Sequence, residues 1–228
     1  MSKDLAIILN NGSINSAVAT AIAAQRYRLV MLHMIWGSED QEGEKTTTRG
    51  RVAFDQQTAH FKPYREHVLE MSFLSLLSAP GAPKRTSSEG AETRLESRLS
   101  APLLDLLPLT ACATRFAAHH QAAAVYLGLR VGTGVDELAQ ATEYVQIWQD
   151  LIQLPCGIPD LELAAPLLEM EPWQVVDLGF QLNVPFERTW SCIGDGGEPC
   201  WACRGCRSRE SAFQQAAKPD PLRLARRG

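Results

Sequence analysis

Four cysteines within fifteen residues near the C-terminus constrain this chain more than any other feature. They are Cys192, Cys200, Cys203 and Cys206, and the last three follow one another at intervals of three. Two overlapping C-x-x-C steps form tight turns that aim their sulfurs inward, and a fourth ligand from a nearby loop completes a tetrahedral site. Thiolates favour zinc over magnesium or calcium, and four protein ligands leave no position open for catalysis. The pattern predicts a structural Zn²⁺ site.

Two other kinds of cysteine cluster compete with zinc. A redox or disulfide cluster is disfavoured, because Cys112 and Cys156 lie in apolar sequence surroundings and no signal peptide is recognisable. Both observations suit a reducing cytoplasm, where clustered cysteines are more often metal ligands than disulfides. An iron–sulfur cluster remains the main alternative, since it also takes four thiolates.

The composition excludes several classes of protein. The chain has 228 residues, of which 45% are hydrophobic and 21% charged, and its formal net charge is −4. These values are ordinary for a globular domain. The acidic balance argues against a nucleic-acid partner or a membrane surface, and no apolar run approaches the length of a membrane span. A cytoplasmic globular protein is the expectation.

Short apolar runs alternate with helical stretches along the chain, which predicts an α/β fold with a doubly wound, mostly parallel sheet. The expected division is a main domain over residues 1–186 and a zinc-binding subdomain over residues 187–228. The expected strands are 4–9, 28–35, 66–71, 122–129 and 161–166, and the expected helices are 17–25, 52–60, 102–120, 143–154, 172–182 and 207–217.

A small polar loop joins the first strand to the first helix. It reads Asn10-Asn11-Gly12-Ser13-Ile14-Asn15-Ser16. A strand followed by such a loop and a helix can bind phosphate, because the first N–H groups of a helix lack intrahelical partners. Asn15 or Ser16 could equally serve only as the N-cap of the helix. From the residues alone, capping is the simpler interpretation.

The C-terminal region resembles a known family. Thr189-Trp190-Ser191-Cys192, the three later cysteines and the run Arg209-Glu210-Ser211-Ala212-Phe213 are similar to the end of the 7-cyano-7-deazaguanine synthase (QueC) family. This resemblance implies a fold of the PP-loop ATP pyrophosphatase superfamily, with a phosphate-binding loop of the form S-G-G-x-D-S after the first strand. It also implies a purine or 7-deazapurine ligand, and a homodimer, since family members often dimerise.

By this resemblance the candidate nucleotide-binding residues are Asn11, Gly12, Ser13, Asn15 and Ser16. Gly12 and Ser16 match the family loop. Ser13 replaces a glycine that lets the backbone approach the phosphates, and Asn15 replaces a carboxylate able to help hold Mg²⁺. The resemblance thus suggests ATP and Mg²⁺ as cofactors, and these departures oppose both.

Other family features are also altered. Relatives carry a lysine near residues 173–175, whereas this chain has none between Lys84 and Lys218. Asp136 and Glu137 are only rough counterparts of acidic residues that face the deazapurine in the family. Residues 78–97 are rich in Ala, Gly, Pro and Ser, which indicates an inserted loop.

Two functions follow. The chain is either a divergent synthase-like enzyme, with altered or lost ATP-dependent carboxylate activation, or a catalytically inactive, zinc-stabilised scaffold that binds a nucleotide or a partner. If active, it would be an ATP-dependent ligase that forms C–N bonds. ATP-to-AMP turnover discriminates the two, because only the first predicts it.

Overall fold

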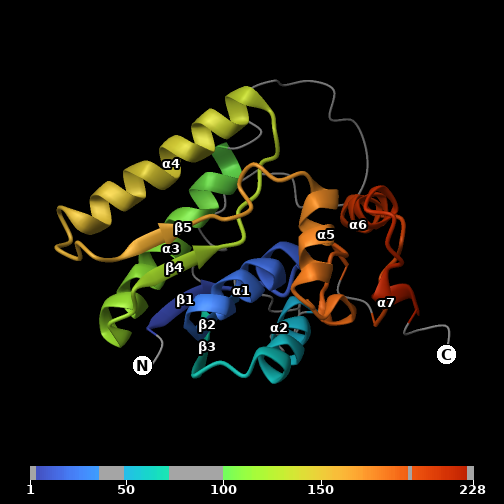
Figure 1. Cartoon of the computed structure of the whole chain (residues 1–228), viewed down its shortest axis with the longest axis horizontal. Coiled ribbons are helices and arrows are strands. Elements are labelled where there is room, and N and C mark those ends of the chain that lie inside the picture. Colours follow the sequence, from blue (N-terminus) through green and yellow to red (C-terminus); the bar gives the residue numbers. More distant parts are fainter. Residues whose placement is uncertain (1–3, 36–48, 72–99, 195–196, 225–228) are drawn as a thin grey trace, which may run out of the picture.

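The computed structural model describes residues 4–35, 49–71, 100–194 and 197–224, and it has a five-stranded parallel sheet at its centre (Figure 1). The strand order is β3-β2-β1-β4-β5. The strands are β1 (Leu5–Leu9), β2 (Arg28–Ile35), β3 (Arg65–Glu70), β4 (Ala124–Leu127) and β5 (Glu162–Ala164). The prediction of a doubly wound parallel sheet is confirmed.

The strand order places a switch point at the middle of the sheet. The chain runs outward from β1 to β2 and β3, and then returns to place β4 on the other side of β1. The loops after β1 and β4 therefore leave the carboxyl edge of the sheet in opposite directions. Such a point is the usual ligand position in open α/β sheets.

Helices cover both faces of the sheet (Figure 1). They are α1 (Ile14–Arg26), α2 (Arg49–Phe61), α3 (Ser100–His120), α4 (Val135–Gln153), α5 (Pro172–Gln181), α6 (Arg204–Gln215) and α7 (Pro221–Leu224), with a 3₁₀ turn η2 (Phe186–Arg188). In the described ranges, no helix combines the length and apolarity needed to cross a bilayer.

Alternation along the strands divides the core between the two faces, because successive strand residues point to opposite sides. Ile7 of β1 packs with Ala117 of α3 and Ile152 of α4. Its neighbours on β1, Ala6 and Ile8, pack instead with Ala23 of α1 and Phe54 of α2. Each face of the sheet is thus buried under a different helix pair.

A third cluster joins the N-terminal and C-terminal parts of the chain. Val18 of α1 packs with Val176 of α5, and with Ala212 and Phe213 of α6. Phe186 and Phe213 meet edge to face, with ring centroids 5.2 Å apart. The helix that follows the cysteines therefore completes the apolar surroundings of α1.

Several sequence expectations need correction. Helix α4 begins at Val135 rather than residue 143, because the exposed and mainly polar first half of this helix hides the helical period. The N-cap of α1 is Ser13 rather than Asn15 or Ser16. Cys156 is exposed and does not pack in the core. The loop expected at residues 78–97 lies outside the described residues.

Candidate functional site

The turn after β1 is built around the buried side chain of Asn10, which is 2% exposed. Its Oδ1 accepts hydrogen bonds from the Gly12 N–H, at 2.8 Å, and from the Ser16 hydroxyl, at 3.3 Å. Its Nδ2 donates to Thr20 Oγ1 and to Gln57 Oε1. A buried amide with its donors and acceptor engaged fixes the path of the backbone around it.

Side chains of the turn itself occupy further backbone donors. The Ser13 N–H donates to Asn11 Oδ1 at 3.1 Å, and the Ser16 N–H donates to Ser13 Oγ at 3.4 Å. The Ser16 hydroxyl also lies within bonding distance of Asn11 and Ser13. Asn15 is half-buried in the first turn of α1. The N–H groups of Gly12, Ser13 and Ser16 are therefore already bonded within the turn.

Two glycines permit the close packing of this turn. Gly12 has φ +81°, and a Cβ there would lie 2.9 Å from the Ala53 side chain and collide with the carbonyl of Gly50. A Cβ on Gly128, just after β4, would approach the Ser16 nitrogen to 2.9 Å. The two loops at the switch point thus touch backbone to backbone. The match of Gly12 to the family pattern has a local steric reason, and sequence reasoning missed Gly128.

His33 lies beneath the turn and was not singled out by the sequence. Its Nδ1 donates to the carbonyl of Asn10 at 2.9 Å, because a carbonyl oxygen can only accept. The ring is buried against Phe54. Desolvation lowers the pKa of His33 below its usual 6.5, and the charge of Arg51 lowers it further, although the hydrogen bond to Asn10 opposes this. Burial therefore favours the neutral form of this imidazole.

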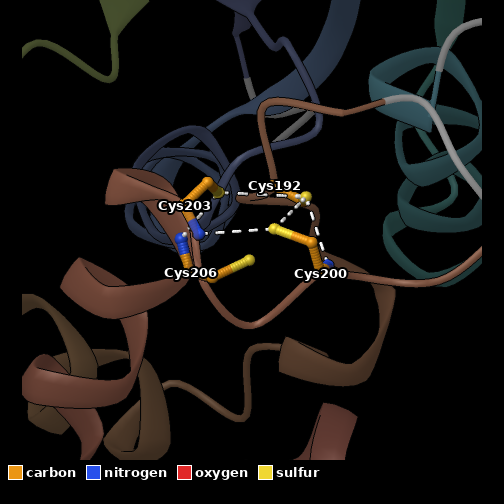
Figure 2. Close-up of side chains that lie close together, drawn as sticks. All are labelled: Cys192, Cys200, Cys203 and Cys206. Carbon is orange, nitrogen blue, oxygen red and sulfur yellow. Dashed lines mark hydrogen bonds between the residues drawn. The ribbon is translucent and has the colours of Figure 1, made fainter. Parts of the chain in front are cut away.

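The four C-terminal cysteines converge on one point (Figure 2). All four sulfurs lie within 4.8 Å of one another. The sulfur of Cys192 is 3.5 Å from that of Cys200 and 3.9 Å from that of Cys203. Four thiolates at about 2.3 Å from a tetrahedral metal are separated by about 3.8 Å. The spacing of the sulfurs fits a single metal ion.

Backbone N–H groups prepare part of this cluster for metal binding. N–H groups of Ala202 and Cys203 lower the pKa of Cys200. Burial raises the pKa of Cys203, but N–H groups of Ile193 and Cys206 outweigh it and bring this pKa down to about 6. Burial raises the pKa of Cys206. A metal would therefore meet Cys200 and Cys203 readily as thiolates, whereas it would have to displace a proton from Cys206.

The cysteine loop is continuous with the helix that anchors it. Cys203 is the N-cap of α6, and its sulfur accepts from the Cys206 N–H at 3.4 Å. Gly205 lies against the carbonyl of Ser191, where any Cβ would collide. Cys203 thereby serves both as a potential metal ligand and as the N-cap of α6.

Hydrogen bonds join the turn after β1 to the segment that leads into the cysteines. The Trp190 N–H donates to the Gly12 carbonyl at 2.9 Å. Gln57 Nε2 donates to the same carbonyl and to the carbonyl of Arg188, each at 3.1 Å. Gln57 is fully buried, so its amide links the turn, α2 and the η2 segment in one network.

Arg209 forms the second buried polar link, on the other side of the cysteine loop. This side chain is 3% exposed. Its guanidinium makes two bonds to the Asp220 carboxylate, at 2.7 and 2.8 Å. It also donates to the hydroxyl and carbonyl of Thr189 and to the carbonyl of Phe186. The sequence pattern included Arg209 but gave no sign of its partners.

The loop after β4 reaches the start of α5. Thr133 donates to the Glu171 carboxylate through its hydroxyl, at 2.8 Å, and its N–H, at 3.2 Å. Beside it lies a hollow of about 590 Å³ along the first half of α4, whose lining includes Glu143 and Glu169. Asp136 and Glu137 lie in the first turn of α4, and neither lines this hollow.

Comparison with known proteins gives one family. The family described as "Queuosine biosynthesis protein QueC" matches residues 5–217. The 7-cyano-7-deazaguanine synthase of Chloroherpeton thalassium is 28% identical over 233 residues, which cover 95% of each chain. That of Methanoculleus marisnigri is 27% identical and covers 97% of this chain and 99% of its own.

Among solved structures, a U34-tRNA thiolase, NcsA from Methanococcus maripaludis with its 4Fe–4S cluster, is 12% identical. It covers 99% of this chain and 67% of its own, with a TM-score of 0.47. This likeness is too weak to add to the fold or to the function.

Proposed function

Since the chain belongs to the QueC family of queuosine biosynthesis proteins, we propose that it is a divergent 7-cyano-7-deazaguanine synthase-like protein. It binds a 7-deazapurine or purine nucleotide, and its ATP-dependent carboxylate activation is altered or lost. The relatives match along nearly their whole length, which supports the ligand class. The altered turn after β1 supports the change in chemistry.

One observation carries this proposal: backbone N–H groups of the turn donate hydrogen bonds to side chains of the same turn. Activation of a carboxylate by ATP expels pyrophosphate, whose charge must be stabilised by free backbone donors and Mg²⁺. Here Asn10, Asn11 and Ser13 already accept from N–H groups of the turn. Asn15 offers no carboxylate for Mg²⁺. A phosphate group would have to displace these internal bonds.

We propose Zn²⁺ as the structural metal of the four cysteines. Sulfur separations of 3.5 and 3.9 Å match one tetrahedral ion better than a cluster of several metal atoms and sulfides, which holds its thiolates farther apart. Elemental analysis of the purified protein tests this directly. One zinc per chain and no visible absorption are expected, whereas iron accompanied by visible absorption would identify iron–sulfur ligation.

We place the purine-type ligand in the hollow beside α4. This hollow lies at the loop that leaves β4 at the switch point, where ligands of open α/β sheets bind. The carboxylates of Glu143 and Glu169, which line it, can accept the N–H donors on the edge of a guanine-like ring.

The test is calorimetric titration of zinc-loaded protein with ATP–Mg²⁺, AMP and 7-carboxy-7-deazaguanine, followed by an AMP-release assay. We expect deazapurine binding with little or no AMP release. The double variant Ser13→Gly/Asn15→Asp restores the family pattern and is expected to strengthen ATP binding, whereas Ser13→Ala is the matched control. Strong ATP binding with rapid AMP release by the unaltered chain would contradict the proposal.

A second candidate function, a catalytically inactive scaffold, is favoured by the network around Gln57. Gln57 bonds the turn and the η2 segment to α2 without any ligand. Binding of a ligand or partner with no turnover of any acid substrate would favour the scaffold. The family resemblance also leads us to propose a homodimer, which sedimentation velocity tests.

A further inference from the structure

A small concave pocket lies at the edge of the sheet opposite the turn after β1. It is bounded by the last residues of α1 and α2 and by the first residue of β2. The lining includes Tyr27, Arg28, Phe61, Lys62 and Tyr64, and the cavity volume is about 320 Å³. In Figure 1 this is the region where the chain passes from α2 into β3. Neither function proposed above uses this pocket.

Cations gather around the pocket and are held by aromatic rings. The guanidinium of Arg28 lies 4.3 Å from the centre of the Tyr64 ring, and that of Arg65 lies 5.3 Å from it. Arg26 lies 5.0 Å from the centre of the Tyr27 ring. Ring contacts of this kind hold an arginine in place without neutralising it.

The cations at the pocket are not held in ion pairs. Among the described residues, none of Arg26, Arg28, Lys62 and Arg65 forms an ion pair. The carboxylates of Glu162 and Asp4 act on the hydroxyl of Tyr27, but neither pairs with these cations. In a chain with a net charge of −4, two cations, Arg28 and Lys62, line this cavity, and Arg26 and Arg65 contact tyrosine rings of its lining.

Helix ends explain only part of this arrangement. Arg26 ends α1 and Lys62 follows α2, and a cation at a helix C-terminus is favourable in itself. Arg28 and Arg65, however, are the first residues of β2 and β3. The placement of Arg28 in the lining, with Arg65 against the same Tyr64 ring, needs another reason.

Lys62 also adopts an unfavourable backbone conformation. Its φ is +49°, in the left-handed region, and it follows the last residue of α2, where glycine is the favoured residue. A lysine at this position strains the backbone but places an ammonium group at the pocket. This makes Lys62 a useful probe, because a substitution to glycine affects backbone strain and charge in opposite ways.

We propose that this pocket binds the phosphate group of a small phosphorylated molecule. Arginine and lysine together form the usual protein surroundings of a phosphate, since the guanidinium offers paired donors and the ammonium a point charge. Tyr64 orients Arg28 and Arg65 before the ligand arrives, and the cavity is large enough for a phosphate group with a small substituent. A nucleotide and a sugar phosphate share this chemistry.

The test is calorimetric titration of the full chain with AMP, ribose 5-phosphate and adenosine. AMP and ribose 5-phosphate are expected to bind, and Arg28→Gln to weaken both roughly tenfold or more, because hydrogen bonds to a charged group are lost. Arg115→Gln on α3, which removes the same charge from an exposed position, is expected to change affinity less than about twofold. Binding of AMP but not of ribose 5-phosphate would assign the pocket to nucleotides alone.

The Lys62→Gly variant separates a binding role from a structural one. Its melting temperature is expected to rise by about 2 °C, since left-handed strain is relieved, while phosphate affinity falls. The proposal is overturned if Arg28→Gln weakens the binding of adenosine as much as that of AMP, if Arg115→Gln weakens binding as much as Arg28→Gln, or if Lys62→Gly and Arg28→Gln leave affinity unchanged. It is also overturned if neither phosphate compound binds.

Discussion

The backbone N–H of Trp190 donates to the carbonyl of Gly12 over 2.9 Å, although the two residues are 178 positions apart. Trp190 precedes the first cysteine of the cluster by two residues, and Gly12 lies in the turn after β1. Gln57 donates to the same Gly12 carbonyl. A disturbance of the cysteine cluster should therefore reach the turn through backbone contacts.

Loss of one metal ligand should unfold the C-terminal part of the chain. Cys206→Ser is expected to abolish stoichiometric metal binding and lower the melting temperature by about 10 °C or more, because loss of a structural metal is among the most destabilising changes. Elemental analysis and calorimetry provide the measurements. Cys156→Ser is the control, since Cys156 is exposed and outside the cluster. An equally small effect of both variants would contradict a structural metal.

Replacement of Gln57 should destabilise the turn without removing any ligand-binding side chain. Gln57→Leu leaves Asn10 Nδ2 and the carbonyls of Gly12 and Arg188 without this partner, at a cost of about 2–4 kcal/mol. Urea unfolding measures the change. The neighbouring Gln56→Leu is the matched control, because Gln56 is exposed, and it should alter stability by less than about 0.5 kcal/mol.

Removal of Arg209 should leave a buried carboxylate unpaired. Arg209→Met is expected to cost about 3–5 kcal/mol, because Asp220 is buried and loses both of its charge-assisted bonds. Arg207→Met removes an exposed arginine from the same helix and should have little effect. If the two variants unfolded at the same urea concentration, the buried pair would have no special role.

His33 should make the free energy of unfolding decrease as the pH falls. Its folded pKa is below the ordinary 6.5, so the unfolded chain binds protons first as the pH falls. The contribution of His33 is therefore fully present above about pH 6.5 and is lost as the pH falls through the lowered folded pKa. His67 and His120 are shifted in the same direction by burial and add to the slope.

The measurement is urea unfolding at a series of pH values between about 5 and 7.5. His33→Gln keeps a donor for the Asn10 carbonyl but cannot titrate, so it should show a shallower fall in stability than the unaltered chain. His60→Gln serves as the exposed control. A slope unchanged by His33→Gln would mean that this imidazole does not control the acid sensitivity.

Local patterns predicted the elements of the fold because each strand and helix carries its own signal. The apolar run of residues 4–9 became β1 at the centre of the sheet, and the alanine-rich run after Ser16 became α1. The first half of α4 escaped detection, since Ala141 is its only buried residue and the helical period is therefore weak there. The spacing of the cysteines predicted that their sulfurs meet at one point, because the four ligands are close together in the chain.

The polar network of the site could not be predicted in the same way. Gln57, Arg209 and His33 look ordinary in the sequence, and no local pattern links them to their partners Arg188, Asp220 and Asn10, which lie 131, 11 and 23 residues away. Glutamine and arginine are mostly exposed in folded proteins, and histidine is intermediate. Only the packing of α2, α6 and β2 around the turn makes these side chains buried and fully bonded.

The packing of α1 against α6 also bears on how the protein is made. Val18 leaves the ribosome some 190 residues before its core neighbours Ala212 and Phe213. At a translation rate of about 5–20 residues per second, roughly ten to forty seconds pass before α6 is synthesised and can bury the apolar face of α1. During that interval the nascent chain is a natural client for chaperones that shield exposed apolar surface.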